Sequence, residues 1–324
     1  MDEAEQASET QSVAALMSLV RVNQEGRHHV VLVGDPAQLP PVYASRHHAV
    51  TFLTTHRRFR FGVKMNRQFI SLFERLFNTE RAVAIILTHH YRSHPDLAHC
   101  TLTHTYKDLL LHPLPRGQFE TPFNNIAGED GLQCLTIVDT RLSRDRYEGT
   151  GRNTPGRSPM VNNIELSIAN DILFRIYQHR GDFDLTDNIH VAAPYQDMAE
   201  ALQSFLSAPR RFFARYPELN VHIGTTDSLQ GTERSVSVIC LTRSNLSGDI
   251  GFLKVNNRLN VAYTRAKHLL VIIGDFNTMC QSDISKWMYD SAVQEYPRTS
   301  LQIYRPPLRR IDHVQERLDR MNLF

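Results

Sequence analysis

Two carboxylates stand side by side near the start of the chain, at Asp2 and Glu3. An adjacent aspartate and glutamate suit nucleotide hydrolysis, because the aspartate can hold Mg²⁺ while the glutamate polarises an attacking water. An acidic terminus is also commonly just the solvated end of a chain. The pair therefore indicates metal-dependent chemistry only where other motifs accompany it.

A more specific group follows the apolar run at residues 30–33, where residues 34–41 read Gly-Asp-Pro-Ala-Gln-Leu-Pro-Pro. The run predicts a buried parallel strand, and ligands of such sheets bind at the carboxyl ends of the strands. Prolines stiffen the loop, so we expect Asp35 and Gln38 to be held in place. The alternative is a rigid turn without a ligand.

An arginine stands in a short polar motif at residues 91–95, Tyr-Arg-Ser-His-Pro, directly after an apolar run at residues 85–87. The run predicts a strand, and Arg92 would then lie in the loop beyond its carboxyl end. Taken alone, the motif equally fits a surface arginine.

Residues 225–233 form a polar loop between predicted strands at 220–223 and 236–241. The loop offers hydroxyls, an amide, a flexible glycine at Gly231 and a carboxylate at Glu233. Such a set can bind nucleic-acid phosphates on one side and a nucleotide ribose on the other. A plain polar loop remains the alternative.

Residues 258–267, Arg-Leu-Asn-Val-Ala-Tyr-Thr-Arg-Ala-Lys, are predicted to be helical. Arg258 and Arg265 stand one heptad apart, and a planar guanidinium is well suited to bind a γ-phosphate. The alternative is an amphipathic helix with surface arginines. Four apolar residues at helical spacing would face the core: Leu259, Ala262, Ala266 and Leu269.

Further strands are predicted at residues 135–138, 189–192 and 269–273, and helices at 164–178 and 196–206. Strands that alternate with helices indicate an α/β fold, with a parallel sheet covered by helices on both faces. Residues 43–62 are rich in His and Arg without a clear period. Residues 139–160 carry five arginines among Gly, Pro, Ser and Asn, which predicts a long surface loop.

The bulk composition excludes several classes of protein. The chain has 324 residues, 41% hydrophobic and 22% charged, with no apolar run of membrane-spanning length and no secretory signal at its acidic start. Its four cysteines are far apart, which argues against a zinc site or a disulfide framework and favours the cytoplasm or nucleus. At a net charge of +2, a nucleic-acid partner would have to bind a local basic strip.

Taken in order, the motifs resemble those of superfamily 1 helicases, in the Upf-like branch of 5′-to-3′ RNA and DNA helicases. Residues 2–6 resemble motif II, 34–41 motif III, 91–95 the Tyr-Arg-x-His-Pro signature, 226–233 with 241–245 motif V, and 258–267 motif VI. Weaker likenesses are the helix that closes the first motor domain (71–76), an N-x-x-E helix start (162–165) and Trp287 after the last strand. The resemblance covers roughly residues 1–295.

The resemblance implies a RecA-like P-loop NTPase fold, with one incomplete and one complete lobe. Residues 1–84 would be the C-terminal part of the first lobe and 85–295 the second. Residues 296–324 would form a C-terminal tail, which we expect to be a loosely attached helix from about residue 300. ATP and Mg²⁺ would be the cofactors, and the partner would be single-stranded RNA or DNA, with possible protein partners in a larger complex and no membrane.

The resemblance also implies roles for individual residues. By this likeness Asp2 would hold Mg²⁺, Glu3 would activate the attacking water, and Gln38 would sense the γ-phosphate. Arg92 and Arg265 would be arginine fingers, and Glu233 would contact the ribose. The remaining residues expected to bind ATP are Gly34, Asp35, Gly231 and Arg258, and those expected to bind the strand are Tyr195, Thr226 and Ser228.

The chain departs from the family pattern in two places. It holds no G-x-x-x-x-G-K-[ST] loop, which in the family cradles the phosphates, and Met198 stands where a strand-binding glutamine is expected. We therefore expect a C-terminal fragment of an ATP-dependent helicase that hardly hydrolyses ATP alone. The alternatives are an ATPase-inactive module that binds nucleic acid or protein, and a superfamily 1 helicase with a fused nuclease.

Overall fold

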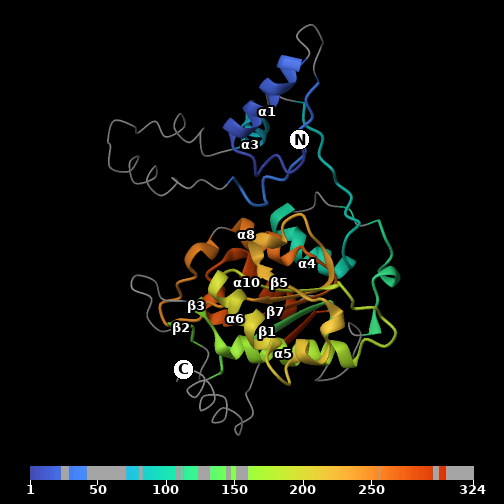
Figure 1. Ribbon diagram of the computed structural model, residues 1–324, viewed down its shortest axis with the longest axis vertical. Coiled ribbons are helices and arrows are strands. Elements are labelled where there is room, and N and C mark those ends of the chain that lie inside the picture. The colour runs from blue at the N-terminus through green and yellow to red at the C-terminus, as the bar shows by residue number, and fades with distance from the viewer. Residues whose placement is uncertain are drawn as a thin grey trace. The chain divides into compact units, whose positions relative to one another are not determined.

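The computed structural model describes residues 1–22, 29–41, 71–79, 83–106, 111, 113–122, 132–143, 147–150, 160–254, 256–294 and 299–303 (Figure 1). The chain divides into two compact units, Met1–Thr88 and His89–Phe324. The assignment of these units to the two motor lobes stays a prediction. The His- and Arg-rich stretch at 43–62 lies outside the described residues.

The second unit is built on a six-stranded sheet whose pairings are all parallel, in the order β5-β4-β6-β7-β1-β8. Its strands are β1 (Leu135–Asp139), β4 (Ile189–Ala193), β5 (His222–Thr225), β6 (Arg234–Cys240), β7 (Ala266–Gly274) and β8 (Thr299–Ile303). Five of these were predicted from apolar runs. In β1 and β4 every residue is buried, as expected of strands covered on both faces.

Helices cover both faces of this sheet, which confirms the predicted α/β fold (Figure 1). One apolar core lies between the sheet and α5, α6 and α7; the other lies between the sheet and α4, α8 and α10. The helices are α4 (Pro95–Tyr106), α5 (Asn163–Gln178), α6 (Gln196–Ser207), α7 (Phe212–Arg215), α8 (Asn256–Tyr263), α9 (Phe276–Met279) and α10 (Asp283–Gln294). Short 3₁₀ turns are η4 (Arg116–Gln118), η6 (Pro217–Leu219), η7 (Thr226–Leu229) and η8 (Gly251–Lys254).

The start of α5 explains why the N-x-x-E pattern at residues 162–165 predicts the beginning of a helix. Asn162 is the N-cap, and its side chain accepts a hydrogen bond from the backbone N–H of Glu165. This bond satisfies one of the amide groups that a helix start leaves without an intrahelical partner. The predicted N-x-x-E helix start is therefore confirmed.

The predicted helix over 258–267 is wrong in its second half. Helix α8 ends at Tyr263, and strand β7 begins at Ala266, so Arg265 and Lys267 are not on a helix. The four apolar residues are all buried as expected, but Ala266 and Leu269 reach the core from a strand. Apolar spacing marked the buried positions correctly and left the helix end undetermined.

Two predicted strands and part of the predicted tail are also wrong. Residues 30–33 and 85–87 form no strand, and most of their apolar side chains are exposed. An apolar run forms a strand only where neighbouring strands pair with it, and in the described part of the chain these runs lack such a sheet. Conversely, residues 299–303, expected within the loose tail, form β8 and pair with β1.

The predicted loop at 139–160 contains regular structure at its far end. Strand β2 (Gly149–Thr150) pairs antiparallel with β3 (Met160–Val161). At its near end Arg141 forms an ion pair with Asp139, at 2.6 Å. The other four arginines of this loop lie outside the described residues.

The first unit contains helices α1 (Glu9–Val22) and α3 (Leu72–Asn78) in its described part. Ser71 caps α3 by accepting a hydrogen bond from the backbone of Glu74, at the place where the resemblance predicted a closing helix. Arg75 of α3 donates to Glu9 of α1 at 2.6 Å, so the two helices are joined by a charged contact. No helix in the described residues is long and apolar enough to cross a membrane.

Candidate functional site

In the first unit, the motif II and motif III segments lie side by side. The Ala4 amide donates to the Val33 carbonyl at 2.9 Å, and the Val33 amide donates to the Met1 carbonyl at 2.8 Å. Gly34 fits closely at this contact, because a Cβ there would displace the Glu5 carboxylate and crowd the Glu5 amide. Burial raises the pKa of that Glu5 carboxyl.

The loop after Gly34 is fixed by its own side chains. Asp35 accepts from the Ala37 amide at 2.9 Å with one carboxylate oxygen and from the Gln38 side-chain amide at 3.0 Å with the other. Asp2 and Glu3 are exposed on the neighbouring segment. Such an exposed carboxylate fits Mg²⁺, which keeps several waters and takes one or two protein carboxylates. Asp2 would hold the ion, which would neutralise phosphate charge.

In the second unit, three separate stretches of chain meet at Glu233, directly before β6. Its carboxylate accepts from Arg92 Nε at 2.6 Å and from Lys267 Nζ at 2.7 Å. Partial burial opposes the ionised form, but the hydrogen bonds from Lys267 and Arg92 outweigh it, so the pKa of Glu233 is lowered. Glu233 is therefore a carboxylate held between two cations at the amino ends of β6 and β7.

Arg92 is held through two of its three guanidinium nitrogens. Its Nε donates to Glu233, and its Nη1 donates to the Thr264 carbonyl at 3.1 Å. Within the described residues Nη2 has no hydrogen-bond partner, and 32% of the side chain is exposed. An arginine held in this way can donate from Nη2 to a phosphate oxygen.

Arg265 differs from the expected exposed finger. Its residue is only 2% exposed, and its guanidinium donates to the Val261 carbonyl at 2.9 Å, to Thr264 Oγ1 at 2.9 Å and to the Thr232 carbonyl at 3.4 Å. These contacts close the end of α8 and fasten the loop before Glu233. In this structure Arg265 holds backbone in place next to Glu233 and does not point into solvent.

The loop at 226–233 joins the two edges of the sheet. It leaves β5 at a carboxyl end and enters β6 at an amino end. Gly231 has a φ of 73°, a left-handed conformation that favours glycine. Ser228 is exposed and donates to the Thr225 carbonyl at 2.7 Å, whereas Thr226 is 1% exposed.

Arg258 anchors this loop to α8. Its Nε contacts both carboxylate oxygens of Asp227, at 3.2 and 3.1 Å, and its guanidinium lies 4.8 Å from the centre of the Phe252 ring. The side chain is 30% exposed. The structure thus brings Arg258 to the start of the polar loop at Asp227, whereas Glu233 stands at the end of that loop.

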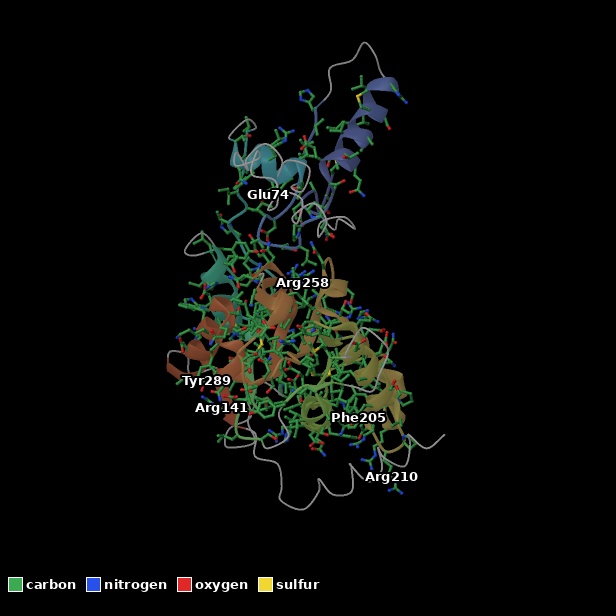
Figure 2. All side chains as sticks on the ribbon, turned by 90° about the vertical axis from the view of Figure 1, so that its left-hand side faces the viewer. Glu74, Arg141, Phe205, Arg210, Arg258 and Tyr289 are labelled. Atoms are coloured by element: carbon green, nitrogen blue, oxygen red, sulfur yellow. The ribbon has the colours of Figure 1, made fainter. Side chains whose placement is uncertain are left out.

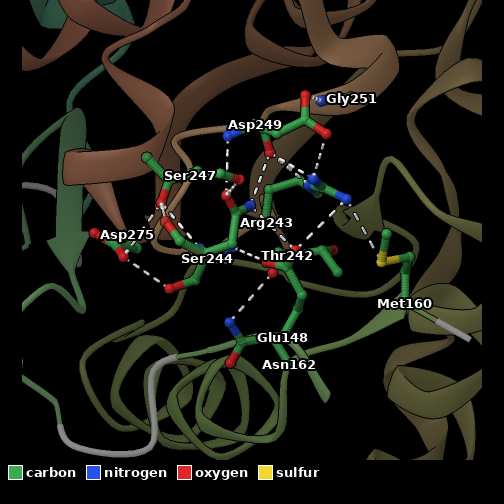
Figure 3. Close-up of polar contacts among 12 residues, drawn as sticks. Glu148, Met160, Asn162, Thr242, Arg243, Ser244, Ser247, Asp249, Gly251 and Asp275 are labelled. Atoms are coloured by element: carbon green, nitrogen blue, oxygen red, sulfur yellow. Dashed lines mark hydrogen bonds and ion pairs between the residues drawn. The ribbon is translucent and has the colours of Figure 1, made fainter. Parts of the chain in front are cut away.

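A second polar group lies at the carboxyl edge of the sheet, where Tyr195 follows β4 and residues 242–244 follow β6 (Figure 3). Arg243 is 6% exposed; it pairs with Asp249 at 3.0 Å and with Glu148 at 3.5 Å. Tyr195 is 8% exposed, its ring lies 4.5 Å from that of Phe252, and burial raises the pKa of its phenol.

The candidate residues therefore separate into two groups within the second unit. Arg92, Glu233 and Arg265 gather at the amino ends of β6 and β7, while Tyr195, Thr226 and Ser228 follow the carboxyl ends of β4 and β5. These nucleotide and strand candidates are thus at opposite edges, and the loop at 226–233 spans the distance between them. Arg258, which was also expected to bind ATP, lies instead with the strand candidates, because it pairs with Asp227.

Comparisons with known proteins agree with the order of the motifs. A family model described as "AAA domain" matches residues 69–277, more than half of the chain, and a second model with the same description matches residues 1–46. The chain belongs to the Upf-like superfamily 1 helicases.

Relatives of this helicase chain include named helicases and a DNA-binding protein. It is 28% identical over 267 residues to "DNA-binding protein SMUBP-2" of Mesocricetus auratus, covering 80% of this chain and 24% of the relative. It is 26% identical to "Helicase sen1" of Schizosaccharomyces pombe, covering 90% and 15%, and 25% identical to "Helicase SEN1" of Saccharomyces cerevisiae, covering 90% and 12%. The helicase chain spans a third or less of the length of these relatives.

Several residues of this helicase chain escaped the sequence reasoning. The sequence places Lys267 only in the predicted helix at 258–267 and Arg243 only in the motif V resemblance, and it gives no signal for Glu148. The signal for Arg243 was its place directly after an apolar strand, which is where ligand-binding residues of parallel sheets stand. Nothing in the sequence signals the pairing of Glu148 with Arg243, since they are far apart in the chain.

Proposed function

We propose that this chain is part of an ATP-dependent helicase that couples ATP hydrolysis to movement along a single strand of RNA or DNA. The supporting observation is the Glu233 cluster, in which Arg92, Glu233 and Lys267 come from three distant segments and meet with short ion pairs. A surface carboxylate needs no such arrangement, whereas a site for a polyphosphate needs cations held in fixed positions.

In this proposal Arg92 is the arginine that acts on the γ-phosphate. Glu233 and the Thr264 carbonyl hold Nε and Nη1 of its guanidinium, so little conformational freedom is lost when Nη2 binds a phosphate oxygen. Glu233 also supplies an oxygen for a ribose hydroxyl. Arg265 acts as a positioning residue, because its contacts fix the Thr232 carbonyl and the end of α8.

The strand would bind at the opposite edge, near Tyr195, Thr226 and Ser228. Relatives named as helicases and as a DNA-binding protein support a nucleic-acid partner. The loop at 226–233 gives a physical route between the sites, since a shift of Glu233 would move a loop whose other end lies at the strand edge. In the first unit, Asp2, Glu3, Asp35 and Gln38 would complete the hydrolytic machinery.

The test is the rate of ATP hydrolysis by the natural gene product that carries this chain, at saturating single strand. We expect Arg92→Ala to lower kcat by about 10³-fold or more with little change in KM, because the guanidinium acts mainly on the transition state. Arg92→Lys should not restore the rate, since an ammonium lacks the planar fork. Glu218→Gln, which changes an exposed carboxylate on η6, is the control and should leave kcat unchanged.

An unchanged kcat for a folded Arg92→Ala protein would contradict the proposed role of the cluster. A second candidate function is an ATPase-inactive module that holds nucleic acid or protein. The observation that favours it is that Arg265, expected to reach a phosphate, is 2% exposed and donates to backbone carbonyls. If the natural gene product lacks ATP turnover but still binds single strands, the module is the better description.

A further inference from the structure

A basic and aromatic surface lies on the second unit before the amino end of β5, and none of the candidate site residues belongs to it. It is formed by the end of α5 and by the segment after α6, which reads Ala-Pro-Arg-Arg-Phe-Phe-Ala-Arg-Tyr over residues 208–216. Between residues 203 and 220 the chain carries three arginines and a single carboxylate, that of Glu218. Figure 2 shows Arg210 projecting from the surface near Phe205.

Two arginines of this surface, Arg180 and Arg215, lie over aromatic rings. Arg180 lies 3.6 Å from the centre of the Tyr177 ring, and Arg215 lies 5.6 Å from that of Phe174. The Tyr177 ring in turn stacks on Tyr216 at 3.7 Å. Within the part of the chain that the structure describes, none of Arg180, Arg210 and Arg215 forms a salt bridge. Their positive charge is therefore available to an external anion.

A hollow of about 320 Å³ opens beside these arginines. Its walls combine two rings with groups that can form hydrogen bonds; they include Phe213, Tyr216, Gln203, Ser207 and Asn220. The volume is at the lower end of the range for small-ligand sites, about 300 Å³. Rings for stacking, amides for base edges and guanidinium groups for phosphates are the combination that single-stranded nucleic acids require.

The backbone at Arg210 supports a role beyond packing. Its φ is 69°, in the left-handed region that side chains other than glycine, asparagine and aspartate rarely adopt. This conformation costs on the order of 1 kcal/mol, yet the position carries a long exposed cation and no glycine. A residue that is kept at a conformational cost while facing solvent is a candidate for binding.

We propose that this surface, around Arg210, Arg215 and the Phe213–Tyr216 hollow, is an auxiliary binding site for single-stranded RNA or DNA. This inference rests on the proposed function and adds a contact outside the edge where Tyr195, Thr226 and Ser228 stand. An acidic polypeptide would satisfy the arginines but would leave the rings and amides of the hollow unused. For that reason the observations favour a strand.

The experiment measures binding of labelled oligo-uridine and oligo-thymidine to residues 1–324 by fluorescence anisotropy at several salt concentrations. We expect Arg210→Gln/Arg215→Gln to weaken binding about tenfold and to lower the slope of log affinity against log salt by about 1.4, which corresponds to two phosphate contacts. Lys286→Gln, which removes a positive charge from an exposed lysine on α10, is the control for charge loss outside this surface. It should leave both quantities unchanged.

A second variant separates binding from folding. Arg210→Gly relieves the left-handed backbone and removes the cation, so it should melt at or above the temperature of the parent chain while binding the strand more weakly. Cross-linking of a 4-thiouridine oligonucleotide should label the peptide that contains Phe213 and Tyr216. Comparison of the uridine and thymidine oligonucleotides decides whether the site prefers RNA or DNA.

Two outcomes overturn the inference while leaving the proposed function standing. One is strand binding by the double variant with the affinity and salt slope of the parent. The other is competition by polyglutamate as effective as that by the strand, which would make an acidic polypeptide the occupant. If the parent chain binds no strand at all, this inference and the proposed strand partner both fail, whereas the Arg92 experiment still decides the ATPase role.

Discussion

At the scale of single residues, two arginines that look alike in sequence have different surroundings. Arg92 is one-third exposed and, within the described residues, keeps Nη2 of its guanidinium open, whereas Arg265 is 2% exposed and bonds to three protein oxygens. The motifs predicted a site role for both positions. They could not distinguish a group that meets a ligand from one that holds backbone, because that depends on neighbours distant in the chain.

The difference gives a prediction on stability. Arg265→Ala should lower the free energy of unfolding by about 2 to 4 kcal/mol, since it leaves buried carbonyls of Val261 and Thr232 without a donor and opens a cavity. Arg92→Ala should cost less than about 1 kcal/mol, as expected for a partly exposed ion pair. Urea denaturation followed by circular dichroism measures both; equal costs for the two variants would refute the buried positioning role.

At the scale of elements, apolar periodicity predicted the position of five of the six strands of the sheet and two of its main helices. The errors share one cause. A run such as residues 85–87 satisfies the local pattern of a strand, but pairing is decided by other segments. Likewise, the buried positions of residues 258–269 fit one long helix, although the chain changes from α8 to β7 at Thr264 and Arg265.

The junction between α5 and β6 shows an interaction that no periodicity reveals. Glu165, in the first turn of α5, is fully buried and accepts from the Thr242 amide with both oxygens, at 3.1 and 2.9 Å. Thr242 has a φ of 69°, so this bond holds a left-handed residue directly beyond β6. A buried glutamate thus fixes the backbone that positions Arg243.

That glutamate gives a prediction on pH dependence. Burial raises the pKa of Glu165 well above its usual range, with Glu148 and Asp275 adding to the effect. The folded state therefore binds a proton that the unfolded state has already released, and stability falls as the pH rises from the usual glutamate range toward the raised pKa. Glu165→Gln keeps an acceptor for Thr242 and removes this titration, so its melting temperature should vary less between mildly acidic and alkaline pH.

The control for that experiment is Glu200→Gln, on the exposed face of α6. The melting temperature of Glu200→Gln should vary with pH as that of the parent chain does. If the melting temperature of Glu165→Gln varies in the same way, Glu165 is not the group whose titration links stability to pH.

At the scale of the whole molecule, the two units differ in how much core they contain. All six strands of the sheet and both apolar clusters belong to the second unit. In the described residues of the first unit, the buried apolar side chains include only Ala4 and Leu72 besides Pro41, while Val30, Val31 and Val33 are exposed. Burial of apolar surface is the main source of folding free energy, so the second unit should account for most of the stability.

This asymmetry predicts that residues 89–324 fold without the first unit. Their thermal unfolding should be one cooperative transition, with a midpoint within about 4 °C of the main transition of residues 1–324, because a larger shift would mean that the first unit contributes more than about 1 kcal/mol. Residues 1–88 alone should show no cooperative transition, since the buried side chains in their described part are too few to offset the conformational entropy of the segment. Circular dichroism and calorimetry on residues 1–324, 89–324 and 1–88 measure these transitions. A non-cooperative melt of residues 89–324 would mean that the sheet needs the first unit, and the division of stability inferred from burial would be wrong.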